Sequence, residues 1–327
     1  MTLEDLERVE VIKSAAEKLM KTDSDYRSLR SRYHPDRYPA GSNDQSRAEK
    51  VFIKLGQLWE LLQQPTIILK SKTAEYALGD LLGTGDVSEV YRASSGSCHD
   101  YVAKVSRIPG GDLFVSKESQ YLRLLNKKAD GTTYANYHPR LVDSFLWDDG
   151  FQKRVNIFRE PFRLWSLQAV IEKLGKLDVR HCCWIFRRLL TGLGFAHLQN
   201  VVHGAVLPQH VLIEPENHGV CLCGWIHAVE PKTLVSIVPS THKSWYPPEV
   251  IKQTYAGPET DIYLAAKTII EVGDWDAKTQ RIKLFLESLL VGSPAMRPKD
   301  AWKLEEEFSL LMDSTYGVRR FIPLVLN

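Results

Sequence analysis

This sequence of 327 residues has no long apolar run. A helix that crosses a bilayer needs about twenty mostly apolar residues, and no stretch of that kind occurs. The N-terminal segment alternates charged with apolar residues, so it lacks the continuous apolar core of a secretory signal peptide. We therefore expect a cytoplasmic protein without a membrane partner.

Charge of one sign is not in excess, and cysteine is scarce. The 42 Lys and Arg residues and 40 Asp and Glu residues leave a net charge of +2, so no nucleic-acid partner is expected. There are five cysteines, and neither the adjacent pair Cys182 and Cys183 nor the alternating pair Cys221 and Cys223 matches a disulfide framework or a zinc motif. We predict buried thiols and no metal site.

The segment from residue 203 to 228 reads HGAVLPQHVLIEPENHGVCLCGWIHA. It resembles the catalytic loop HRDLKxxN of protein kinases, followed by a strand and the DFG motif. His203 matches the loop histidine, but Ala205 stands in place of the catalytic aspartate. His210 replaces the metal-binding asparagine, and Gly224 replaces the magnesium-binding aspartate. Phosphoryl transfer needs those carboxylate and oxygen groups, so the resemblance predicts a pseudokinase that is not an enzyme.

Other kinase motifs follow one another in the usual order. The run YALGDLLGTGDVSEVYRA resembles a glycine-rich loop, YVAKV resembles the strand that carries the phosphate-binding lysine, and a helical pattern follows. The resemblance implies a nucleotide-binding set made of Gly83, Gly85, Ser88, Val90, Lys104 and Glu118. For Lys104 and Glu118 a purely structural ion pair is an equally good interpretation. No cofactor is required by this prediction, and ATP without a normal magnesium site is the one candidate ligand.

Downstream motifs resemble the kinase scaffold. WYPPEV, TDIYLAAKTIIEV and AMRP resemble the segments in which this family pairs a glutamate with an arginine. The structural residues implied are His203, Glu249, Asp261 and Arg297. The expected fold class is α+β, with a bilobal kinase-like domain over 74–327. Its small β-rich N-lobe covers about 74–158, its larger helical C-lobe covers about 162–327, and a hinge lies near Arg159, Glu160 and Pro161.

The N-terminal residues lie outside that frame. Tyr26, Leu29 and Tyr33 recur on one helix face, and Pro35 stops this helix. A second predicted helix repeats apolar residues on one face and ends before Pro65. These repeated residues are Ala48, Phe52, Leu55, Trp59 and Leu62. Two such faces joined by a short loop predict an antiparallel helical hairpin.

The hairpin resembles a J domain, the module that stimulates ATP hydrolysis by DnaK-type chaperones. SLRSRYHPDR resembles the basic helix that leads into the HPD loop, and AEKVFIKLGQLWELL resembles the following helix. The resemblance implies a chaperone-binding set made of His34, Pro35, Asp36, Arg27, Arg30 and Arg37. The predicted J domain covers 1–66 and a linker covers 67–73. The alternative interpretation of HPD is a helix stop with a self-bonded turn, and that of the arginines is a solvated helix face.

Two functions from different classes follow. In the first, a catalytically inactive kinase-like adaptor recruits and stimulates a DnaK-type chaperone through its J domain, while the kinase-like lobes bind an unknown client or partner protein. In the second, the kinase-like domain is a nucleotide-binding sensor, or a residual non-standard kinase, whose occupancy regulates the rest of the chain.

Overall fold

The computed structural model describes residues 1–160, 164–317 and 320–326. The predicted hinge residue Pro161 and the predicted lobe boundary at 162 lie outside the described residues. The chain forms two compact units, one of residues 1–84 with 89–103 and the other of residues 85–88 with 104–327. None of the helices in the described ranges is both long and apolar enough to span a membrane.

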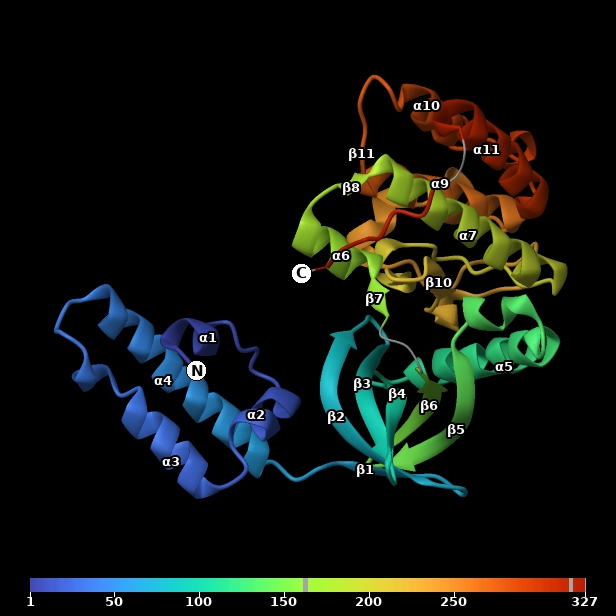
Figure 1. The fold of residues 1–327 in the computed structure, drawn as a ribbon. Coiled ribbons are helices and arrows are strands. Elements are labelled where there is room, and N and C mark those ends of the chain that lie inside the picture. The colour runs from blue at the N-terminus through green and yellow to red at the C-terminus, as the bar shows by residue number, and fades with distance from the viewer. Residues whose placement is uncertain (161–163, 318–319, 327) are drawn as a thin grey trace. The chain divides into compact units, whose positions relative to one another are not determined.

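The first unit opens with helices and continues with strands (Figure 1). Its helices are α1 (Leu3–Glu7), α2 (Lys13–Leu19), α3 (Asp23–Arg32) and α4 (Asn43–Gln63). The strands that follow are β1 (Ile68–Lys70), β2 (Glu75–Thr84), β3 (Ser88–Ser95) and β4 (Cys98–Ser106), of which β3 and β4 have residues in both units. Consecutive strands are neighbours in the sheet, and β2 pairs antiparallel with both β1 and β3. The residues predicted to form a linker therefore contain the short strand β1.

Local capping explains where the longer N-terminal helices begin. Thr22 and Asp25 form a capping box at the start of α3, and the Ser42 hydroxyl accepts the Gln45 backbone N–H at the start of α4. The next proline after each helix, Pro35 or Pro65, follows within a few residues of its end. The region that leads into α3 forms two short helices, α1 and α2, rather than one continuous helix.

An apolar core holds the four N-terminal helices together. The buried members are Leu6, Ala16, Met20, Tyr33, Val51, Leu55 and Leu58. Tyr26 stacks on Trp59, whereas His34, eight positions further along, meets Phe52. Because residue numbers rise along α3 while those of their partners fall along α4, the two helices run antiparallel. The predicted hairpin is present.

The second unit begins with α5 (Gly111–Ala129) and the antiparallel hairpin of β5 (Arg140–Asp148) and β6 (Gln152–Arg159). Helices dominate after residue 164: α6 (Leu167–Leu174), α7 (Val179–Leu198), α8 (Pro248–Ile251), α9 (Pro258–Val272), α10 (Gln280–Ser288) and α11 (Ala301–Tyr316). Helix α7 is the central one, since most of its side chains are buried and it packs against both α9 and α11. Strands β9 (Val211–Glu214) and β10 (Gly219–Leu222) form a hairpin, and β7 (Trp165–Ser166) pairs with β9. The short strands β8 (Leu177–Asp178) and β11 (Gly273–Asp274) pair in parallel.

The order of elements agrees with the predicted class. Strands dominate from β2 to β6, with α5 among them, and helices dominate from α6 onward (Figure 1). This mixed α and β arrangement, rich in sheet at first and helical afterwards, is consistent with a protein kinase fold.

Candidate functional site

The HPD tripeptide forms an exposed turn directly after α3. Tyr33 caps the helix and is buried, while Pro35–Arg37 form one turn of 3₁₀ helix that His34 caps. The Asp36 backbone N–H donates to Nδ1 of His34 at 3.3 Å, and the imidazole meets the ring of Phe52 edge-on at 5.0 Å between centroids. The side chain of Asp36 is 86% exposed and that of His34 is 44% exposed. The turn is therefore fixed at its base while its polar groups face solvent.

The predicted arginines are not equivalent. Arg27 is exposed and pairs with Asp23 at 2.7 Å. Arg37 is exposed, and its guanidinium donates to the carbonyl of Ser31. Arg30 instead lies 3.8 Å above the ring centroid of Phe52 and donates to the hydroxyl of Tyr26. A cation over an aromatic face stabilises the hairpin, so the structure places Arg30 within the packing rather than with the exposed charges.

Lys104 on β4 and Glu118 on α5 form a buried ion pair. Nζ of Lys104 lies 2.6 Å from Oε1 of Glu118, and the two side chains are 10% and 1% exposed. Nδ2 of Asn156 donates to Oε2 of Glu118 and to the carbonyl of Val115, which fixes the carboxylate from the β6 side. Sequence reasoning missed Asn156, although a polar residue between the apolar residues of VNIF was the available signal.

The glycine-rich segment is open around its glycines. A Cβ added at Gly83 would meet nothing within 4 Å, and one at Gly85 would meet only the carbonyl of Ser88, at 3.5 Å. The Gly85 N–H donates to that carbonyl and closes the turn. Gly83 pairs with Val90 across β2 and β3 in the first unit, while Gly85 and Ser88 belong to the second. Contacts within the chain therefore do not explain why glycine occupies either position.

A buried carboxylate organises the segment that follows α7. Asp261 accepts the backbone N–H groups of His203 and Gly204, both at 2.7 Å, and contacts Nε2 of His197 at 2.9 Å. The imidazole of His203 is buried and donates from Nε2 to the carbonyl of Cys223. Asp261 and His203 thus hold residues 203–205 against the segment at 223. His197 on α7 is a further member of this network that the motifs did not indicate.

Ala205, His210 and Gly224 lie together as one packed group. Nδ1 of His210 donates to the carbonyl of Ala205 at 2.8 Å. Gly224 has a φ of +84°, and a Cβ added there would lie 2.8 Å from Cγ and Cδ2 of His210. The imidazole therefore occupies the space into which a side chain at 224 would project.

The surroundings of His210 and His227 disfavour the charged form of both imidazoles. Burial lowers the pKa of His210 well below its ordinary value, and the neighbouring ring of His227 lowers it further. Burial also lowers the pKa of His227 to about 3.

These three positions do not fit a magnesium ion. Mg²⁺ prefers oxygen ligands in octahedral geometry, whereas Ala205, His210 and Gly224 offer a methyl group, an imidazole and no side chain. Within residues 1–160, 164–317 and 320–326, no cluster of three or more His, Cys, Asp or Glu side chains has the arrangement of a metal site. No chemical step through magnesium at this position follows from the structure.

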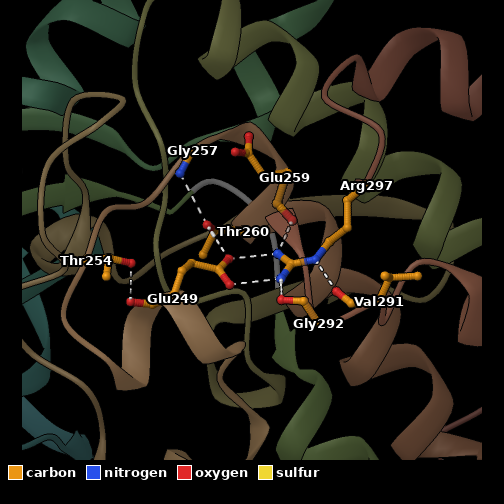
Figure 2. Close-up of polar contacts among 8 residues, drawn as sticks. All are labelled: Glu249, Thr254, Gly257, Glu259, Thr260, Val291, Gly292 and Arg297. Atoms are coloured by element: carbon orange, nitrogen blue, oxygen red, sulfur yellow. Dashed lines mark hydrogen bonds and ion pairs between the residues drawn. The ribbon is translucent and has the colours of Figure 1, made fainter. Parts of the chain in front are cut away.

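Glu249 and Arg297 form a second buried ion pair, shown in Figure 2. The guanidinium donates to both carboxylate oxygens, at 2.7 and 2.8 Å, and also to the carbonyls of Val291 and Gly292. The hydroxyl of Thr260 donates to Oε1 of Glu249 at 3.0 Å. Glu249 and Arg297, which are 48 residues apart in the sequence, thus form an ion pair. Through Thr260 the same network links α8 to α9.

Comparison with known proteins shows the family. The protein kinase domain model matches residues 76–274, which is more than half of the chain. The chain therefore belongs to the protein kinase domain family. No J-domain family matches the N-terminal residues, so that resemblance stays a prediction.

Several curated relatives are kinases by name. A probable serine/threonine-protein kinase of Dictyostelium discoideum is 25% identical over 206 residues, which cover 62% of this chain and 39% of that protein. Sperm motility kinase 3A of Mus musculus is 22% identical over 88% of this chain and 54% of its own length. Serine/threonine-protein kinase STK11 of Rattus norvegicus is 26% identical over 65% of this chain and 50% of its own length. The chain thus spans about half the length of these relatives, or less.

These relatives correct the prediction that the chain is not an enzyme. That prediction rested on the side chains at Ala205, His210 and Gly224 alone. Relatives named as serine/threonine kinases point to a protein kinase rather than to a non-enzymatic homologue. The physical reason for the error is that three side chains describe only the usual positions of the base and the metal ligands, and catalytic groups at other positions are not excluded by them.

Proposed function

We propose that the N-terminal helices recruit and stimulate a DnaK-type chaperone, and that the attached protein kinase domain binds a client or partner protein. The single observation that carries the proposal is the exposed turn His34–Pro35–Asp36 at the end of an antiparallel amphipathic hairpin. Its base is fixed by Phe52 and by the buried Tyr33, so the polar groups are presented in one arrangement.

The charges around this turn support a partner with an acidic surface. Arg27 and Arg37 are exposed near the turn, and the side chain of Asp36 is largely exposed to solvent. A turn that served only to stop α3 would explain the proline and the hydrogen bond from the Asp36 N–H to Nδ1 of His34, but it would not explain an aspartate side chain that faces solvent. Contacts between exposed charges weaken as salt rises, so the proposed association is expected to be sensitive to ionic strength.

Replacing His34 by Gln is expected to remove at least about nine-tenths of the stimulation of a DnaK-type ATPase. This tenfold loss corresponds to about 1.4 kcal/mol of free energy. The change removes the imidazole and leaves the helices that flank it. Steady-state ATP hydrolysis by the chaperone, with wild type and variant at the same salt concentration, measures the effect.

The matched control is Arg8→Gln, which removes an exposed charge from the residue that caps α1, at a distance in sequence from the turn. It is expected to keep full stimulation. Equal stimulation by wild type and His34→Gln would contradict the proposal, as would no stimulation of any chaperone tested with the wild-type chain.

We also propose that the kinase domain binds ATP through Lys104. The buried 2.6 Å pair with Glu118 favours this second function, because it holds the ammonium group in one place. The names of the relatives support nucleotide use as well. Since Ala205, His210 and Gly224 do not fit magnesium, binding is expected to persist when the metal is chelated.

The test uses the double variant Lys104→Met/Glu118→Gln, which removes both charges and so leaves no unpaired buried carboxylate. Titration calorimetry with ATP and EDTA is expected to show at least about tenfold weaker binding than wild type, or about 1.4 kcal/mol. Lys117→Met, on the same helix, is the control and should bind like wild type. Equal affinity in the double variant would contradict a role for Lys104. Transfer of label from γ-labelled ATP to serine or threonine peptides measures phosphoryl transfer in the same samples.

A further inference from the structure

Three aromatic rings from distant parts of the chain stack in one column within the second unit. Trp184 lies on α7, His218 lies in the turn between β9 and β10, and Phe321 lies in the C-terminal segment. The centroids of Trp184 and His218 are 4.2 Å apart with planes 5° from parallel. Those of His218 and Phe321 are also 4.2 Å apart, at 26°. The imidazole is therefore covered on both faces.

The C-terminal segment contacts His218 through a ring and a hydrogen bond. Nε2 of His218 donates to the carbonyl of Ile322 at 2.8 Å, since a carbonyl only accepts. Leu324 is buried at 6% exposure, whereas Phe321 is 58% exposed and Val325 is exposed as well. Much of the segment therefore faces solvent although Phe321 stacks on His218.

The slot that receives Phe321 is built by the rest of the unit. Trp184 projects from the central helix α7, and its indole N–H donates to Nδ1 of His181 at 3.2 Å. His218 has a φ of +54°, the left-handed region that few residues other than glycine occupy. The stack on Trp184 positions the ring of His218 independently of the tail.

We propose that Trp184 and His218 form a docking slot for a peptide segment of a partner protein that carries an aromatic residue followed by an aliphatic one, and that residues 320–326 fill this slot in cis. The tail itself shows the chemistry that fits: a ring on the face of His218, then a backbone carbonyl on Nε2. Because much of the tail is exposed while it covers the slot, a partner segment with the same chemistry can displace it. This inference rests on the proposed partner binding by the kinase domain and does not depend on chaperone recruitment.

The test is the binding of a labelled peptide of residues 320–326 to the full chain, followed by fluorescence anisotropy. The variant Phe321→Ala weakens the tail in cis, so it is expected to bind the peptide at least about tenfold more tightly than wild type does. The double variant Phe321→Ala/His218→Gly should not bind. Glycine suits the φ of +54° at this position, so the second change removes the ring without straining the turn.

The matched control is Phe151→Ala, which removes an aromatic ring that is 79% exposed between β5 and β6. It should bind the peptide no more tightly than wild type. Equal affinities of wild type and Phe321→Ala would overturn the proposal, as would no binding to Phe321→Ala at any peptide concentration. Concentration-dependent dimers of wild type that disappear in Phe321→Ala would assign the slot to the tail of a second copy and so overturn the assignment to a partner. A failure here leaves the chaperone measurement with His34→Gln unaffected.

Discussion

Replacing Arg297 by Met is expected to lower the free energy of unfolding by about 3–5 kcal/mol. Methionine keeps much of the length of the side chain, but it leaves the carboxylate of Glu249 buried without a counter-charge. The side chains of Arg297 and Glu249 are 0% and 4% exposed, so water cannot replace the lost donor. The carbonyls of Val291 and Gly292 lose their donor as well. Urea unfolding followed by tryptophan fluorescence measures the change.

Two further variants make this result specific. Arg297→Met combined with Glu249→Gln removes the unpaired charge and is expected to recover part of the loss, because the penalty comes mainly from the buried carboxylate. Arg180→Met breaks a 2.7 Å pair with Asp178 in which the side chains are 50% and 44% exposed, and it should cost no more than about 0.5 kcal/mol. A loss below about 1 kcal/mol in Arg297→Met would show that the network contributes little.

Replacing Gly224 by Ala is expected to cost about 2–5 kcal/mol. A φ of +84° disfavours any residue with a Cβ by about 1–2 kcal/mol. The added Cβ would also lie 2.8 Å from the ring of His210, whose Nδ1 is held by the carbonyl of Ala205, and such overpacking costs about 1–3 kcal/mol. Chemical denaturation measures the sum. The same ring would meet the side chain of an aspartate at this position.

The two contributions can be separated by a double-mutant cycle with His210→Ala. If the ring causes the clash, the double variant should be more stable than the sum of the single losses predicts, by at least about 1 kcal/mol. Gly56→Ala is the matched control, because Gly56 lies within α4 and a Cβ there would meet nothing within 4 Å. It should stabilise the chain by about 0.4–1 kcal/mol. Strict additivity of Gly224→Ala and His210→Ala would contradict the packing described here.

Much of the fold could be predicted because its signals are local. Proline stops, capping residues and apolar spacing placed α3 and α4, and the match of Tyr26 with Trp59 follows from those spacings. Strand β1 was predicted as linker because a three-residue strand carries no usable alternation. Its pairing with β2 is visible only once both strands are placed.

The candidate site was predictable where a motif names its residues, and less so where contacts join distant segments. The pairing of Lys104 with Glu118 was expected as a candidate, whereas the contact of His210 with Gly224 was not, since the sequence shows only which usual residues are missing. Arg30 was grouped with Arg27 and Arg37 because the J-domain resemblance implies one chaperone-binding set. The long side chain of Arg30 packs on the ring of Phe52, however, and helical spacing alone does not predict this contact.

The division of the chain into two units restricts how it can be cut or exchanged. The chain passes between the units after residues 84, 88 and 103, so that β3 and β4 each contribute residues to both. Neither unit is a continuous stretch, and no single cleavage of the backbone can release one from the other. Residues 1–66 precede the first of these crossings and include their own buried core. We therefore expect that these residues can be moved as a block to another protein with loss of the hydrogen bond from Ser14 to Asp80 on β2, whereas the strands that follow must be transferred together with the kinase domain.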